Sequence, residues 1–351
     1  MIHINMFSSA DKVAGQGVGS AYLELMRLLK KYGQQSFEVT VNQYGSADIS
    51  HYHTIDPQFF LSTFIGHRGR KIGYVHFLPE TLEGSLQLPR PIKAILDKYV
   101  IAFYKRMDQI VVVNPIFIDK LAAYGIPKSK IAYIPNFVSQ DEFYAQSEHK
   151  KAQTRASLGI KADAFVVFGD GQVQKRKGVD DFVALAKRHP EMNFVWAGGF
   201  SFGKMTDGYE KYKKIIDNPP KNLTFTGIVE RKSLVDFYNM ADVFLLPSYD
   251  ELFPMSVLEA FSCQTPVLLR DLPLYQAIIS GYYASGSDLA GLDEQLVYLK
   301  ENPEERQRLK LAAKAAATKF SEQNLAKIWQ DFYLKQAHNQ MSQLVEDLMK
   351  N

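Results

Sequence analysis

The sequence predicts an α/β protein of two doubly wound parallel-sheet domains with a cleft between them. Short apolar stretches typical of buried strands alternate with helical stretches, and such alternation indicates a parallel sheet covered by helices. The alternation occurs twice, on either side of a polar segment at residues 139–159 that we interpret as a linker. The length of 351 residues also favours two domains over a single core.

Strand and helix signals place the elements of each half. The predicted strands of the first half lie at residues 2–7, 37–42, 71–77, 109–113 and 130–135, and its clearest helices lie at 19–32 and 115–125. The predicted strands of the second half lie at residues 164–170, 193–198, 222–227, 242–248 and 265–270. Beyond about residue 288 the chain is predicted to be helical, with Pro303 at a helix start.

Composition narrows the class of protein. With 46% hydrophobic and 23% charged residues the chain is globular. A single cysteine, Cys263, excludes a disulfide framework within the chain and fits a reducing compartment. The amino terminus lacks a secretory signal pattern, and no apolar stretch is long enough for a membrane-spanning helix. We therefore expect a cytoplasmic protein that does not cross a membrane.

Positive charge is concentrated in the first half of the chain. Residues 1–138 carry 15 Lys/Arg and 10 Asp/Glu, although the net charge of the whole chain is only +3. Basic clusters stand among aromatic residues and could face anionic lipid or nucleic acid, or could form an ordinary solvated surface. The aromatic residues do not form an RNA-binding signature, so no nucleic-acid partner is expected. The clusters consist of Arg68, Arg70 and Lys71; Arg90, Lys93 and Lys98; and Lys105 and Arg106.

Two glutamates, Glu251 and Glu259, follow the predicted strand at residues 242–248. Ligands of open parallel sheets bind at the carboxyl edge of the strands. We expect Glu251 in a loop and Glu259 in the helix that follows, both facing one bound molecule. The start of that helix would offer free N–H groups to a phosphate. Carboxylates for hydroxyls beside amides for phosphate indicate a sugar nucleotide.

Four separated elements in this order resemble the retaining, nucleotide-sugar-dependent glycosyltransferases of family 4, which have the GT-B fold. They are residues 15–29, 111–138, 175–199 and the segment around the two glutamates. The resemblance implies two Rossmann-like domains, with an acceptor- and membrane-binding domain at 1–140 and a nucleotide-sugar-binding domain at 150–320. A C-terminal helix, at about 322–351, is expected to pack back on the first domain. Details of the second half look most like bacterial enzymes that add a second hexose to α-glucosyl-diacylglycerol.

The resemblance also implies roles for individual residues. Arg176 and Lys177 would bind the diphosphate of the donor, where charge develops as the sugar bond breaks. Glu259 would bind the ribose, and Glu251 would contact the sugar or its approach to the cleft. His76 would line the cleft and orient the substrate. The catalytic set is then His76, Glu251 and Lys177. The donor-binding set is Gly17, Arg176, Lys177, Glu251, Phe253, Pro254, Met255, Ser256 and Glu259.

The chain departs from the family pattern at two places. Many family members have an arginine just after the strand, where this chain has the run Gly169–Gln172; one cationic contact is then missing, or Arg176 or Lys175 replaces it. The family commonly has glycine after the first glutamate, where this chain has Leu252, followed by Phe253 and Pro254. The second departure leaves the shape of the sugar pocket open.

A metal centre is not expected. His51 and His53 end a strand and resemble a metal pair, but no third ligand stands at a suitable spacing. The fold does not require a divalent cation, although one could stimulate the reaction, and no tightly bound cofactor is expected. UDP-glucose or UDP-galactose is the expected donor substrate.

Two segments are alternative candidates for the membrane contact. In residues 91–107 an apolar stripe shares one helical face, which could lie on an anionic membrane or on the domain's own sheet. If it packs on the sheet, residues 57–71 become the better membrane contact, because aromatic residues there precede a basic cluster. The predicted membrane and acceptor residues are Phe59, Phe60, Arg68, Arg70, Lys71, Lys98, Lys105 and Arg106.

The leading hypothesis is a peripheral enzyme on the inner face of the cell membrane. It would transfer an α-hexosyl unit from a UDP-sugar to glucosyl-diacylglycerol with retention, making a diglycosyl-diacylglycerol. A second hypothesis keeps the chemistry and changes the acceptor to a soluble or polyprenyl-linked saccharide, as in capsule or teichoic-acid assembly. A third is a nucleotide-sugar-binding or nucleic-acid-binding protein without turnover.

Overall fold

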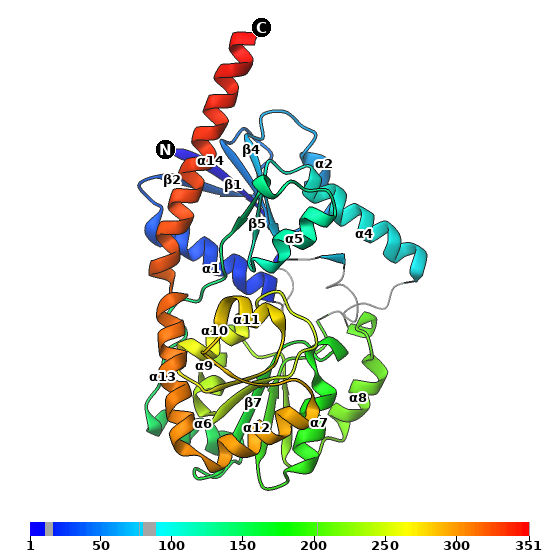
Figure 1. Ribbon diagram of the computed structural model, residues 1–351, viewed down its shortest axis with the longest axis vertical. Coiled ribbons are helices and arrows are strands. Elements are labelled where there is room, and N and C mark those ends of the chain that lie inside the picture. The colour runs from blue at the N-terminus through cyan, green and yellow to red at the C-terminus, as the bar shows by residue number, and fades with distance from the viewer. Residues whose placement is uncertain (11–16, 77, 80–88, 202, 351) are drawn as a thin grey trace.

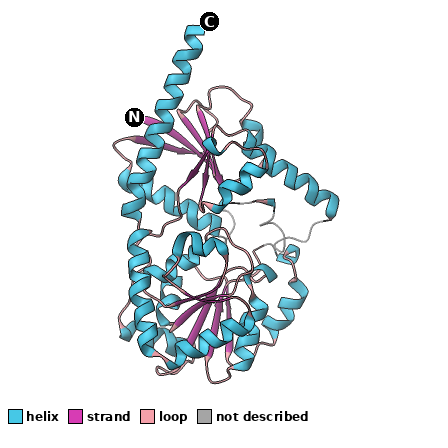
Figure 2. Ribbon diagram, viewed as in Figure 1, coloured by secondary structure: helices cyan, strands magenta, loops and turns pink. Residues whose placement is uncertain are grey.

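The computed structural model describes residues 1–10, 17–76, 78–79, 89–201 and 203–350. It contains two six-stranded sheets, one above the other in Figure 1, with helices on the faces of both sheets (Figure 2). This arrangement confirms the predicted α/β fold with two doubly wound, parallel-sheet domains.

The first sheet has the strand order β2-β1-β3-β4-β5-β6, and its strands pair in parallel. Its central strands are almost fully buried because helices cover both faces. The strands are β1 (Ile2–Phe7), β2 (Phe37–Val41), β3 (Ile49–Tyr52), β4 (Arg70–Val75), β5 (Gln109–Val112) and β6 (Ile131–Tyr133).

The second sheet has the order β12-β11-β10-β7-β8-β9 and is also parallel. Its strands are β7 (Val166–Asp170), β8 (Asn193–Ala197), β9 (Leu223–Gly227), β10 (Val243–Leu246), β11 (Val267–Arg270) and β12 (Ala284–Gly286). The strand β12 was not predicted, because Ala-Ser-Gly carries no β signal and is held by pairing with β11.

The helices of the first domain include α1 (Gly17–Tyr32), α2 (Pro57–Ser62), α4 (Arg90–Lys105) and α5 (Ile116–Ala123). Those of the second include α7 (Val179–Arg188), α8 (Tyr209–Asp217), α9 (Arg231–Met240), α10 (Met255–Ser262) and α11 (Pro273–Ile279). The polar segment 139–159 is not a simple linker, since it contains α6 (Glu148–Ser157), which Ser147 caps and which packs on α9.

The C-terminal region returns to the first domain. After α12 (Leu289–Glu301) and α13 (Pro303–Lys319), the helix α14 (Glu322–Lys350) rises past α1 and contacts β3 and β4 (Figure 1). Trp329 and Tyr333 are buried in this contact, and the Tyr333 hydroxyl lies 2.7 Å from His51 Nδ1. The last helix therefore connects the two halves of the molecule. None of the described helices is long and apolar enough to cross a lipid bilayer.

Candidate functional site

The strand order of the second sheet reverses between β7 and β10, and the candidate site lies at the carboxyl ends of these two strands. Open α/β sheets bind ligands at such a switch point. The loop after β10 carries Glu251, and the next helix, α10, carries Glu259, in the arrangement that the sequence predicts. Pro254 is the N-cap residue of α10, so the helix begins between the two glutamates.

Glu251 is paired with the two cations expected at the diphosphate. Its side chain accepts hydrogen bonds from Lys177 Nζ at 2.5 Å and from Arg176 Nη1 at 3.3 Å. Both cations lie in a short 3-10 helix, Lys175–Lys177, between β7 and α7. Arg176 also donates to the carbonyl of Asp250 at 2.7 Å, whereas Lys175 is exposed. Of the two candidates for the missing arginine, Arg176 alone contacts this cluster.

Burial and charge act in opposite directions on this cluster. Burial alone would raise the pKa of Glu251, but Lys177 and Arg176 outweigh it and hold the pKa below its usual value. Burial lowers the pKa of the Lys177 ammonium, and the carboxylate of Glu251 only partly offsets this. The pair of Lys177 and Glu251 therefore holds a largely buried positive charge that a carboxylate already balances. An anionic ligand at this edge of the sheet would meet that charge.

Glu259 is almost completely buried, with 2% of its surface exposed. Its Oε1 accepts from Arg231 Nη1, and its Oε2 lies 2.8 Å from the hydroxyl of Tyr238. The same hydroxyl lies 2.8 Å from Asp170 Oδ2, at the end of β7. Burial, and then repulsion from Glu259, raises the pKa of Asp170 to about 7. A phenol has one proton to donate, so the Tyr238 hydroxyl can donate to only one of the two carboxyl groups, and the other group can hydrogen-bond to it only when protonated.

The first domain holds the loop between the two glutamates through two side-chain amides. Asn114 Nδ2 donates to the carbonyls of Leu252 at 3.3 Å and Leu274 at 3.0 Å, and Asn136 Nδ2 donates to that of Phe253 at 2.9 Å. Both asparagines are buried. Neither was predicted from the sequence, although both follow closely on strands of the first sheet, at the edge where ligands are expected.

His76 follows β4 at the facing edge of the first sheet and is 9% exposed. Its ring lies against Tyr74, with 4.3 Å between ring centroids, and its Nε2 is 3.4 Å from His53 Nδ1. Burial lowers the pKa of His76 to about 3, so the imidazole is neutral near pH 7. A neutral imidazole can orient a hydroxyl by one hydrogen bond without changing the charge of the cleft.

His51 and His53 are buried beside His76. Burial is the main cause that lowers the pKa of His51 to about 3, and repulsion between its ring and that of His76 when both are protonated is the second cause. Within the described part of the chain no group of three or more His, Cys, Asp or Glu residues is arranged to hold a metal ion.

The remaining residues that the sequence predicts at a donor site lie near the start of two helices. Gly17 opens α1, and a Cβ there would meet nothing within 4 Å, so the space beside it is open. Residues 15 and 16, the start of the segment 15–29 that resembles the family, lie outside the described residues. In the second domain Phe253, Met255 and Ser256 are buried around the first turn of α10.

Several residues expected at the membrane are engaged within the protein. Phe59 and Arg68 are buried, at 2% and 3% exposure, which corrects the expectation that they face a lipid surface. Arg68 lies over Tyr44 and donates to the carbonyl of Gly45. Arg70 donates to Gln336 at 2.6 Å, and Lys71 pairs with Asp108 at 3.4 Å. Lys98 and Lys105 are exposed.

The apolar stripe of α4 divides into two parts. Val100 and Phe103 are buried in the core of the first domain, and Tyr99 packs against it. Towards the start of the helix Ile92 and Ile95 are 52% and 69% exposed. Near its end Arg106 lies over the ring of Phe64, 4.1 Å from the centroid, and Phe60 is partly buried. The stripe therefore packs on its own domain from Leu96 onward, while Ile92 and Ile95 are exposed.

Two facing Rossmann-like domains, with carboxylates and cations between them, define a protein of the GT-B class. Sequence profiles agree: Glycosyltransferase Family 4 matches residues 17–142, and Glycosyl transferases group 1 matches residues 150–316. The chain is 52% identical to alpha-galactosylglucosyldiacylglycerol synthase of Streptococcus pneumoniae, over 96% of this chain and 90% of that protein. The chain belongs to the family 4 glycosyltransferases and is an enzyme of that class.

Further comparisons give one more distant sequence relative and two solved structures with the same fold. The chain is 26% identical to processive diacylglycerol alpha-glucosyltransferase of Acholeplasma laidlawii, over 74% of this chain and 75% of that protein. Anabaena Alr3699/HepE in complex with UDP-glucose superposes with a TM-score of 0.74 at 15% identity, over 95% of this chain and 100% of that chain. Sucrose-phosphate synthase from Thermosynechococcus elongatus superposes with a TM-score of 0.78 at 17% identity, over 95% and 99%. The two structures share the fold.

Proposed function

We propose that this enzyme transfers an α-hexosyl unit from UDP-galactose or UDP-glucose to glucosyl-diacylglycerol, with retention, at a membrane surface. The product is a diglycosyl-diacylglycerol. The pneumococcal relative, an alpha-galactosylglucosyldiacylglycerol synthase, supports this acceptor and favours galactose as the transferred sugar. Two relatives from Acholeplasma laidlawii named for diacylglycerol glycosylation support the same lipid class.

The contact of Lys177 and Arg176 with Glu251 carries the proposal. The two cations bind the diphosphate and compensate the charge that develops on it when the sugar bond breaks. Glu251, released from Lys177 by the arriving phosphate, binds hydroxyls of the transferred sugar. Glu259 binds the ribose through charge-assisted hydrogen bonds.

The reaction needs no carboxylate pair on either side of the sugar. The bond between the anomeric carbon and the β-phosphate oxygen breaks, and the acceptor hydroxyl oxygen bonds to the same face of that carbon. The proton of the acceptor hydroxyl passes to the departing phosphate oxygen. His76, neutral because burial lowers its pKa to about 3, orients the sugar by hydrogen bonding.

A set of exposed apolar side chains on α2, just after α2 and on the first half of α4 supports the membrane location. We call it the α2–α4 surface, and it consists of Leu61, Phe64, Ile65, Ile92 and Ile95. The cations Lys98, Lys105 and Arg106 stand on the same helix or at its end. Apolar side chains that insert between lipids, next to cations that attract anionic headgroups, are typical of peripheral binding.

Transfer of radiolabelled sugar tests the proposal. UDP-galactose and UDP-glucose are offered separately, with and without glucosyl-diacylglycerol, in vesicles that contain anionic lipid. We expect lipid-soluble label only with the glycolipid, and the donor that gives it identifies the sugar. If label passes only to a soluble or polyprenyl-linked saccharide, that saccharide is the acceptor in place of glucosyl-diacylglycerol. If neither donor transfers label, the donor assignment is wrong.

A further inference from the structure

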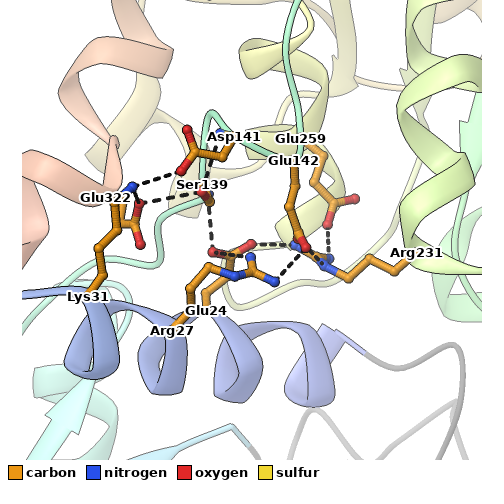
Figure 3. A network of polar contacts seen from close by, with 9 residues as sticks. All are labelled: Glu24, Arg27, Lys31, Ser139, Asp141, Glu142, Arg231, Glu259 and Glu322. Atoms are coloured by element: carbon orange, nitrogen blue, oxygen red, sulfur yellow. Dashed lines mark hydrogen bonds and ion pairs between the residues drawn. The ribbon is translucent and has the colours of Figure 1, made fainter.

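Arg231, the first residue of α9, contacts carboxylates from three separate parts of the chain (Figure 3). Its Nη1 donates to Glu259, and its Nη2 donates to Glu24 Oε1 at 2.6 Å. Its Nε lies 3.4 Å from Glu142 Oε2, and its guanidinium lies over the ring of Phe143. The side chain is 19% exposed, so most of this cluster is withdrawn from water.

Glu24 brings the first domain into this cluster. It lies on α1, is 1% exposed, and its Oε2 accepts from the backbone N–H of Ser139 at 3.1 Å. Arg27, one turn later on α1, lies 3.5 Å from the same oxygen and 2.5 Å from Glu142. The carboxylate of Glu24 is therefore fixed on one side, and its other oxygen faces Arg231.

The guanidinium reaches Glu259 and Glu24 with two different nitrogens of one rigid plane. Such a fork fixes the distance and direction between its two partners, which the single ammonium of a lysine cannot do. With Oε1 held by Arg231 and Oε2 beside Tyr238, the side chain of Glu259 has one orientation. Each oxygen keeps a second lone pair for a further donor.

We propose that Arg231 is a positioning residue that aims Glu259 at the ribose of the donor, and that Glu24 of the first domain anchors Arg231 for this task. This inference rests on the proposed function, because it takes Glu259 as the ribose-binding group. It adds that the ribose subsite of the second domain is complete only when α1 of the first domain is docked against it.

Calorimetric titration with UDP and with 2′,3′-dideoxy-UDP isolates the contribution of the ribose hydroxyls to binding. Both ligands carry the same base and diphosphate, but the dideoxy compound has no ribose hydroxyls for Glu259 to bind. We expect the wild-type enzyme to prefer UDP. In Arg231→Gln we expect UDP affinity to fall by about tenfold or more, the size of a lost hydrogen bond to a charged group, while dideoxy-UDP affinity stays within about twofold.

Three further variants sharpen the result. Arg231→Lys keeps the charge but not the fork, so the preference for UDP should fall nearly as far as in Arg231→Gln. Glu24→Gln should lower UDP affinity by less than Arg231→Gln does, and it should again leave dideoxy-UDP affinity almost unchanged. It tests the inference independently if Arg231→Gln fails to fold. Lys232→Gln is the matched control, because that neighbouring cation is 80% exposed and pairs only with Glu230 among the contacts described.

The outcomes separate this inference from the proposed function. Equal losses for both nucleotides in Arg231→Gln and Glu24→Gln would show a general structural role and overturn the inference. Full recovery of the UDP preference in Arg231→Lys would also overturn it, because charge alone would then suffice. A wild-type enzyme that binds neither nucleotide would instead overturn the proposed donor.

Discussion

The ammonium of Lys177 donates a hydrogen bond to Glu251 across 2.5 Å, and both side chains are largely withdrawn from water. The first comes from the 3-10 helix after β7, and the second from the loop after β10. Two residues far apart in the chain therefore meet where the strand order of the second sheet reverses. The pair supplies a cation for phosphate and a carboxylate for hydroxyls at one place.

Replacing Lys177 by alanine should lower kcat by about a hundredfold, because one preformed electrostatic contact to the leaving group is lost. It also leaves the buried Glu251 with less compensating charge, so UDP should bind more weakly. Steady-state kinetics with a saturating acceptor measures the change. Lys187→Ala, an exposed lysine at the end of α7, is the control and should keep wild-type activity. Equal rates in both variants would exclude Lys177 from the site.

Asn136→Asp should loosen the contact between the domains. The aspartate has nearly the same shape, but when ionised it cannot donate to the carbonyl of Phe253. We expect the free energy of unfolding to fall by about 1–3 kcal/mol, and kcat to fall with it. Urea unfolding and kinetics measure both, with the exposed Asn218→Asp as the control. Wild-type stability and activity in Asn136→Asp would contradict this role.

His76→Ala should lower kcat without changing the shape of the pH profile between about pH 5 and 8. Burial lowers the pKa of His76 to about 3, from an ordinary value of about 6.5. The folded protein therefore does not protonate this group in that range. The unfolded chain does protonate His76 below about pH 6.5. The free energy of unfolding therefore falls as the pH is lowered from about 6.5 towards 3. A wild-type ionisation near 6.5 that His76→Ala removes would contradict the assignment.

Phe64→Ser and Ile95→Ser should weaken binding to vesicles that contain anionic lipid. Each change removes an exposed apolar side chain of the α2–α4 surface, whose burial in lipid should contribute about tenfold in affinity. Flotation of protein with vesicles measures it. Leu311→Ser is matched to these changes, because Leu311 is 61% exposed on α13 in the other half of the molecule. Equal loss in Leu311→Ser, or no loss in the other two, would place the membrane contact elsewhere.

Local pattern and residue type were sufficient to predict the two sheets and the placement of Glu251 in a loop and Glu259 in a helix. They failed where long-range contacts decide the outcome. Arg231 stands in a polar run that is typical of a solvated helix start, and the two carboxylates that accept its hydrogen bonds, Glu259 and Glu24, are 28 and 207 positions away along the chain. Arg68 belongs to a basic cluster in the sequence, but packing on Tyr44 buries it.

Nuclear magnetic resonance of the product made from glucosyl-diacylglycerol and the preferred UDP-sugar tests the central claim most directly. The new linkage is identified from the anomeric proton of the transferred hexose. Because the acceptor is proposed to attack the face that the diphosphate leaves, we predict an α-linked hexose on the glucose of the lipid. A β-linked hexose, or a hexose attached to anything other than that glucose, would contradict the account.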